Sequence, residues 1–144
     1  MAAPLKVGDK LANFTREIEE EKMILFERVV WDRGSNSHSD PEAAKRDGMS
    51  KMIASGQNQM AFYHEMLERN FGDAWVYGGK ISARYIHPVY VGDRLTCQQK
   101  VTDVYDKKGG ALWFVVSDID VTGEGGKQVA RARSITVVRN PTMQ

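Results

Sequence analysis

The fold is decided by residues 52–69, MIASGQNQMAFYHEMLER, in which small and apolar residues recur at helical spacing. Positions 52, 56, 60, 63 and 67 fall on one face of a helix, and Ile53, Phe62 and Met66 widen that face. This pattern predicts the longest helix of the chain. Its apolar face has to be covered by another layer of structure, for which the rest of the sequence supplies strands.

Beyond Gly79 the sequence changes to an alternation of apolar and polar residues with many β-branched side chains. The alternation predicts four strands, at residues 80–91, 94–105, 111–121 and 128–138. Glycine-rich pieces at 109–110 and 123–126 lie where hairpin turns are expected between the later strands. Four successive strands predict an antiparallel meander that wraps around the long helix. The expected fold class is α+β.

The segment before the long helix is predicted to hold smaller elements. Residues 11–18 alternate loosely and predict a short strand, and the following apolar residues recur near a 3.6 period as far as about Trp31. Residues 32–39 are polar and rich in turn formers, which indicates an irregular loop. Asp40 and Pro41 then begin a short helix, with the aspartate as its cap and the proline in its first turn.

Length and composition indicate an ordinary globular protein. The chain has 144 residues, of which 42% are hydrophobic and 27% charged, and this size suits one domain, 1–144. No apolar run approaches the ~20 residues of a membrane span, so we expect no membrane association. The beginning, Met-Ala-Ala-Pro-Leu, lacks the apolar core of a secretory signal, and the single Cys97 cannot form an internal disulfide. We therefore expect a cytoplasmic protein.

The charge pattern and the histidine spacing exclude several classes of site. The formal net charge is +1, and the basic residues are dispersed among acidic ones, so nucleic acid is not an expected partner. The three histidines, His38, His64 and His87, do not have the spacing of metal ligands. We expect no metal and no redox cofactor.

The polar loop and the start of the long helix together suggest acid–base chemistry. His38 lies 18 residues before Gly56, near the predicted beginning of the helix. An imidazole exchanges protons near neutral pH, and the free backbone amides of a helix start stabilise developing negative charge. This combination suits proton transfer on a thioester substrate.

Three motifs in order give the chain a family resemblance. They are His-Ser-Asp-Pro-Glu-Ala-Ala at 38–44, Ile-Ala-Ser-Gly at 53–56 and Pro-Val-Tyr-Val-Gly-Asp at 88–93. Over residues 12–139 the chain resembles the MaoC-like hydratases and dehydratases of the hotdog fold, including the (R)-specific enoyl-CoA hydratases. The resemblance implies a thioester of coenzyme A or acyl carrier protein as substrate. It also implies an aspartate and a histidine as the acid–base pair. The open edges of the predicted sheet could be covered by a second copy, so we expect a homodimer or a heteromeric hotdog partner.

The catalytic residues of the family are carried over position by position. His38 matches the catalytic histidine, and the Gly56 amide matches the donor that holds the thioester carbonyl. The family aspartate lies five positions before the histidine, where this sequence has Arg33, with Asp32 one place earlier. Either the loop has changed length and Asp32 still reaches the site, or His38 lacks this partner. The candidate substrate-binding residues are Asn36, Ser55, Gln57, Asn58 and His64.

Some of these residues have a second interpretation. Gly56 could serve only close packing between helix and sheet, and His64 could be a partly buried histidine bonded to backbone. In the expected mechanism His38, with Asp32, takes a proton from water and delivers one to the α-carbon, while the Gly56 amide stabilises the enolate. Two alternative functions stay open. One is a catalytically silent subunit that binds acyl chains or completes a heteromeric hydratase, and the other is an acyl thioesterase that uses Glu65.

Overall fold

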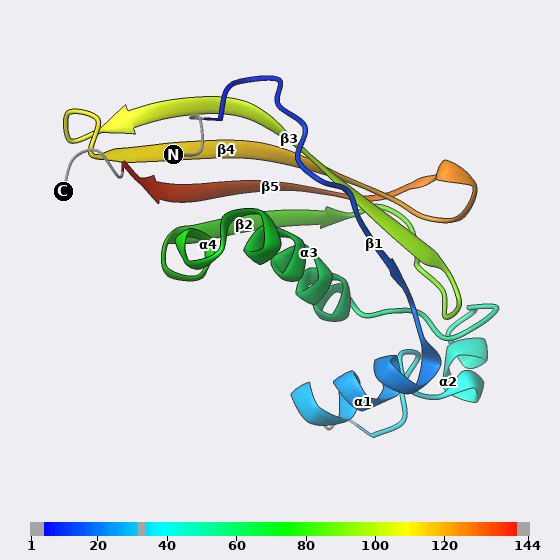
Figure 1. Cartoon of the computed structure of the whole chain (residues 1–144). Helices are drawn as coiled ribbons and strands as arrows, with labels where there is room; N and C mark the ends of the chain where they lie inside the picture. Colours follow the sequence, from blue (N-terminus) through cyan, green and yellow to red (C-terminus); the bar gives the residue numbers. More distant parts are fainter. Residues whose placement is uncertain (1–4, 32–33, 141–144) are drawn as a thin grey trace.

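A five-stranded antiparallel sheet with one long helix on its face is the core of the structure (Figure 1). The computed structural model describes residues 5–31 and 34–140. The strand order is β1-β3-β4-β5-β2, and every neighbouring pair is antiparallel. The bounds are β1 (Phe14–Glu17), β2 (Gly79–Tyr85), β3 (Arg94–Lys107), β4 (Leu112–Thr122) and β5 (Gln128–Arg139). The predicted fold class, α+β with an antiparallel sheet around a long helix, is confirmed.

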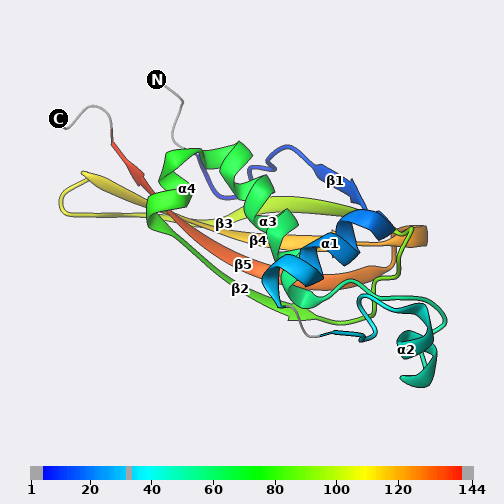
Figure 2. The same ribbon diagram turned by 90° about the horizontal axis from the view of Figure 1, so that it is seen from below.

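The long helix, α3, packs its apolar face on the sheet. The helices are α1 (Glu20–Val30), α2 (Pro41–Arg46), α3 (Gly56–Phe71) and α4 (Asp73–Gly78). Figure 2 shows α3 and α4 over the same face of the sheet, with α1 beside the beginning of α3. Tyr63, Met66 and Leu67 of α3 are completely buried in one core cluster with inward-facing strand residues such as Leu95 and Ile119. Each such side chain contributes roughly 1.5–3 kcal/mol through burial.

The predicted start of the long helix, at Met52, is wrong by four residues. The helix begins at Gly56 because the preceding residues pair with another segment instead. The Ala54 N–H donates to the carbonyl of Val89 at 2.8 Å, and the Val91 N–H donates to the carbonyl of Met52 at 2.9 Å. The Pro-Val-Tyr-Val-Gly-Asp turn at 88–93 therefore holds the chain that leads into α3 in an extended conformation.

The predicted meander of four strands is also only partly correct. Strands β3, β4 and β5 are consecutive neighbours, whereas β2 ends at Tyr85 and pairs with β5, not with β3. The chain after β2 pairs with the segment before α3, so it cannot continue as a hairpin into β3. The short helix α4 was not predicted. It turns the chain from α3 into β2, and a Cβ at Gly79 would lie 2.2 Å from the Trp75 ring, so only glycine fits there.

The smaller elements before α3 agree with the sequence pattern. Strand β1 and helix α1 lie inside the predicted ranges, and α2 begins at Pro41. The Asp40 carboxylate accepts a hydrogen bond from the Glu42 N–H at 2.9 Å, which is the predicted cap. None of the helices in the described part of the chain is long and apolar enough to cross a membrane. The cytoplasmic location stays a prediction.

Candidate active site

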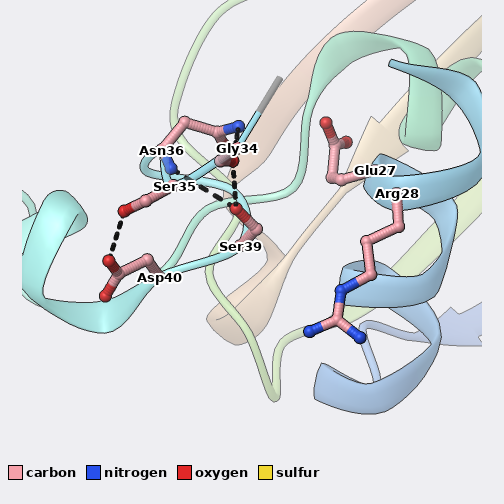
Figure 3. A pocket seen from close by; sticks show the side chains of 7 residues that line it. All are labelled: Glu27, Arg28, Gly34, Ser35, Asn36, Ser39 and Asp40. Atoms are coloured by element: carbon pink, nitrogen blue, oxygen red, sulfur yellow. Dashed lines mark hydrogen bonds between the residues drawn. The ribbon is translucent and has the colours of Figure 1, made fainter. Parts of the chain in front are cut away.

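A cavity of about 500 Å³ lies between α1 and the loop that leads into α2. Figure 3 shows Glu27 and Arg28 of α1 on one side of it and the loop residues on the other. The loop lines the cavity with Gly34, Ser35, Asn36, Ser39 and Asp40. The predicted residue Asn36 is therefore at this cavity, together with two α1 residues that the sequence did not single out.

The loop around His38 is shaped by its own polar side chains. The Asn36 side chain accepts from the His38 N–H at 2.8 Å, and the Asn36 carbonyl accepts from the N–H groups of Ser39 and Asp40 at 3.0 and 2.9 Å. Ser35 donates to the Asp40 carboxylate, and this hydrogen bond, with the one from the Glu42 N–H, lowers the pKa of Asp40. Asp40 therefore remains an ionised cap, as predicted, and is not a proton donor near neutral pH.

His38 is half-buried and anchored to the segment before α3. Its Nδ1 lies 2.8 Å from the carbonyl oxygen of Ile53, while the Ile53 N–H donates to the carbonyl of Ser37 at 3.1 Å. A carbonyl oxygen only accepts hydrogen bonds, so the proton of the neutral imidazole is assigned to Nδ1. Nε2 then carries the lone pair and is the basic nitrogen.

Ser55 joins α1 to the beginning of α3. Its Oγ accepts from the Asn58 N–H at 3.2 Å, which caps α3, and donates to Oε1 of Glu27 at 2.5 Å. Glu27 is only 5% exposed. The sequence analysis missed this residue. The available signal was its place four residues after Met23, on the face of α1 that is buried.

The start of α3 offers free backbone donors beside a tightly packed glycine. In the described part of the chain the N–H groups of Gly56 and Gln57 have no acceptor. A Cβ at Gly56 would lie 2.8 Å from the ring of Tyr85, whose hydroxyl donates to the Gly56 carbonyl at 2.5 Å. Gly56 therefore has a packing role, and its amide is also available to a ligand. Burial raises the pKa of Tyr85. After Glu27, Tyr85 is the second residue near the site that the sequence analysis did not indicate.

The remaining predicted substrate-binding residues are spread along α3. Gln57 is exposed, whereas Asn58 is buried and lines a different cavity, of about 530 Å³, between β1, α1 and α3. His64 is exposed, and neither His64 nor His38 is among the residues that line the cavity between α1 and the His38 loop. Nδ1 of His64 accepts from the Trp75 indole at 3.2 Å, so its partner is a side chain and not the backbone that was expected.

Glu65, the base of the alternative thioesterase mechanism, is held between two cations. Arg16 and Arg69 both donate to its Oε1, the latter at 2.8 Å. Asp32 and Arg33 lie outside the described residues. Within residues 5–31 and 34–140, no three histidine, cysteine, aspartate or glutamate side chains are grouped as a metal site would require.

The sequence matches a known family over most of its length. A family model described as FAS1-like, dehydratase domain region, covers residues 5–132. The chain belongs to this dehydratase family. No curated protein sequence matches it.

Several solved structures have the same fold as this chain. A MaoC-like dehydratase from Rhodospirillum rubrum is 22% identical, with a TM-score of 0.80 and 95% of each chain covered. The R-hydratase PhaJ1 from Pseudomonas aeruginosa is 25% identical, with a TM-score of 0.75, over 94% of this chain and 83% of that one. The ChsH1-ChsH2 complex from Mycobacterium tuberculosis contains a chain that is 16% identical, with a TM-score of 0.75, covering 97% of this chain and all of that one.

The expected hotdog fold and the resemblance to MaoC-like hydratases are thereby confirmed. Three groups are attached to or part of residues 53–57: the His38 imidazole through the Ile53 carbonyl, the Glu27 carboxylate through Ser55, and the free amides of Gly56 and Gln57. Such a set can accept a proton, orient water and stabilise an oxyanion.

Proposed function

We propose that the chain catalyses the reversible addition of water to a 2-enoyl thioester of coenzyme A or acyl carrier protein. The observation that carries the proposal is the anchoring of His38 to Ile53, three residues before the free amide of Gly56. In the proposed site a proton-transfer group is thus bonded to the short segment that also carries the oxyanion donor. The family assignment supports the same chemistry.

The proposed mechanism assigns one role to each group. Nε2 of His38 removes a proton from water as the water oxygen bonds to the β-carbon, and the π electrons move to form the enolate of the thioester. The imidazolium then gives its proton to the α-carbon and returns to the neutral form. The amides of Gly56 and Gln57, with the helix dipole, stabilise the enolate oxygen. In the reverse direction the same steps release water.

A second proton-handling group is expected beside the histidine. The sequence comparison with the family makes Asp32 its candidate, and that role stays a prediction. Removal of either group of such a pair typically costs a factor of about 10²–10⁴ in rate.

The first experiment measures hydration of a panel of short, medium and bulky enoyl-CoA thioesters by the purified chain, beside the His38→Ala variant. We expect turnover of at least one substrate and a loss of about 10²-fold or more in kcat for the variant. His87→Ala, which removes an exposed histidine with no role in the proposed site, is the matched control. Full activity in His38→Ala, or no turnover of any thioester by the unchanged chain, would contradict the proposal.

Association with a second hotdog chain is part of the proposal. Strand β2 is an edge strand with an unpaired side, and an open edge favours pairing with another copy or a related chain. We propose a homodimer. A light-scattering mass of a single chain at micromolar concentration would contradict it, and activity that appears only after addition of a second hotdog protein would instead favour the heteromeric alternative.

Thioester hydrolysis with Glu65 as the base is the less favoured alternative. Because two guanidinium groups already bind its carboxylate, the charge that a base needs is neutralised.

A further inference from the structure

Glu27 is a buried carboxylate that forms no ion pair with a described residue, although Arg28 lines the same cavity. The Glu27 side chain is 5% exposed, and none of the ion pairs in residues 5–31 and 34–140 includes it. Burial of an acid without a cation is costly, and proteins keep such groups mainly where they serve a function. Stability alone therefore does not explain a glutamate at this position.

The two oxygens of the carboxylate have different surroundings. Oε1 accepts from the Ser55 hydroxyl at 2.5 Å, while no described group donates a hydrogen bond to Oε2. Glu27 also lines the cavity of about 500 Å³ between α1 and the His38 loop. One oxygen is thus fixed by the protein, and the other is left for a small molecule in the cavity.

Glu27 and His38 are attached to the same short segment. His38 binds the carbonyl of Ile53, and Glu27 binds the side chain of Ser55. This segment is extended, since Ile53 forms a β-bridge with Tyr90 and Ser55 has φ −65° and ψ 155°. The two hydrogen bonds therefore attach both side chains to one extended segment, two residues apart. Asn36 and Ser39, which flank His38 in its loop, line the cavity together with Glu27.

We propose that Glu27 is a further catalytic residue, which holds the reacting water together with His38. The inference rests on the proposed hydratase function. In the step, Oε2 of Glu27 accepts one hydrogen of the water while Nε2 of His38 removes the other. The water oxygen bonds to the β-carbon, the π electrons form the enolate, and the imidazolium returns its proton to the α-carbon. The carboxylate of Glu27 accepts the hydrogen bond from the water and stabilises the transient imidazolium.

The other acids near the site already form hydrogen bonds or ion pairs with protein groups. The Asp40 carboxylate accepts from Ser35 and from the Glu42 N–H, and Glu65 is paired with Arg16 and Arg69. Among the described acids, Glu27 alone lines this cavity with an oxygen that has no donor. It therefore supplies the carboxylate that the chemistry requires, without dependence on Asp32.

The test compares Glu27→Gln, Glu27→Asp and Ser55→Ala in the full chain. The amide oxygen of glutamine still accepts from Ser55, so Glu27→Gln preserves the structural hydrogen bond but removes the charge. We expect kcat to fall by about 10²–10⁴-fold with KM little changed. Glu27→Asp retains a carboxylate and should recover part of the loss, and Ser55→Ala should lose less than Glu27→Gln. The exposed Glu20→Gln on the same helix is the matched control.

The outcomes separate this inference from the proposed function. Loss of activity in His38→Ala with normal activity in Glu27→Gln overturns the role of Glu27 alone, and so does a loss in Asp32→Asn that Glu27→Gln does not share. Equal losses in Ser55→Ala and Glu27→Gln assign Glu27 a structural role and also overturn it. No turnover by the unchanged chain overturns the proposed function itself. If circular dichroism shows that Glu27→Gln does not fold, kcat is compared between Glu27→Asp and Ser55→Ala instead. A loss in Ser55→Ala as large as the loss in Glu27→Asp then assigns Glu27 a structural role and overturns the inference.

Discussion

Two cavities of similar volume border α1, and each is lined by a glutamate, yet the two acids are in different electrostatic surroundings. The cavity between α1 and the His38 loop, of about 500 Å³, is lined by Glu27 and Arg28, and Glu27 forms no ion pair with a described residue. The cavity beside β1, of about 530 Å³, contains Glu65, which binds Arg16 and Arg69. Neither volume nor the presence of an acid distinguishes a site. The counter-charge does, because it decides whether the carboxylate is free to act on a ligand.

The largest expected effect comes from a change in the core that both regions share. Leu67 of α3 is completely buried, and Leu67→Ala should lower the free energy of unfolding by about 2–5 kcal/mol because it leaves a cavity. Urea denaturation measures the change. Leu25→Ala, at a leucine that is 60% exposed, is the control and should stay within about 0.5 kcal/mol. Equal effects of the two variants would contradict the packing of α3 against the sheet.

A smaller and more local effect is expected at the start of α3. In Gly56→Ala the added Cβ would lie 2.8 Å from the Tyr85 ring, so α3 or Tyr85 has to move. We expect a loss of about 1–3 kcal/mol in stability, as for other overpacked sites. We also expect a fall of about tenfold or more in kcat, since small displacements of catalytic groups are costly. The variant should disturb the cavity beside His38 and leave the Arg16–Glu65 pair intact.

A second substitution separates packing from catalysis in Gly56→Ala. Tyr85→Leu removes the aromatic ring and so makes space for the new Cβ. If the double variant regains stability but not activity, the glycine amide is needed for the substrate as well as for packing. Unchanged stability in Gly56→Ala alone would contradict the close contact between α3 and Tyr85.

The local elements of the fold could be predicted because their signals are local. The 3.6 period of 52–69 and the alternation beyond Gly79 each depend on residues that are near in sequence. The pairing of β2 with β5 could not be read from alternation, which gives a strand but not its neighbour. The true start of α3 depended on hydrogen bonds to residues 89–91, far along the chain.

The candidate site likewise contains residues that local motifs indicate and a residue that depends on a contact far along the chain. His38 and Gly56 were indicated by motifs, and the structure attaches the His38 loop to the segment that leads into Gly56. Glu27 was missed because its one signal, the place four residues after Met23, is weak, and because it follows the exposed Glu20 and Glu21 and resembles one more solvated acid. Its burial depends on Ser55, 28 residues away. A local pattern cannot contain a contact of that range.

The smallest effect is expected for Glu65, because the contrast between the two cavities assigns it no role in catalysis. Glu65→Gln removes a charge that two partly exposed arginines already neutralise, and exposed pairs of this kind contribute about 1 kcal/mol or less. We expect kcat and KM for an enoyl thioester to stay within about twofold, and any thioester hydrolysis to be unaffected, because Glu65 lies in the other cavity. A rate loss comparable to that of Glu27→Gln would show that pairing with two arginines does not prevent a carboxylate from acting in this protein. The difference that we draw between the two cavities would then be wrong. Loss of hydrolysis alone would instead restore the thioesterase alternative.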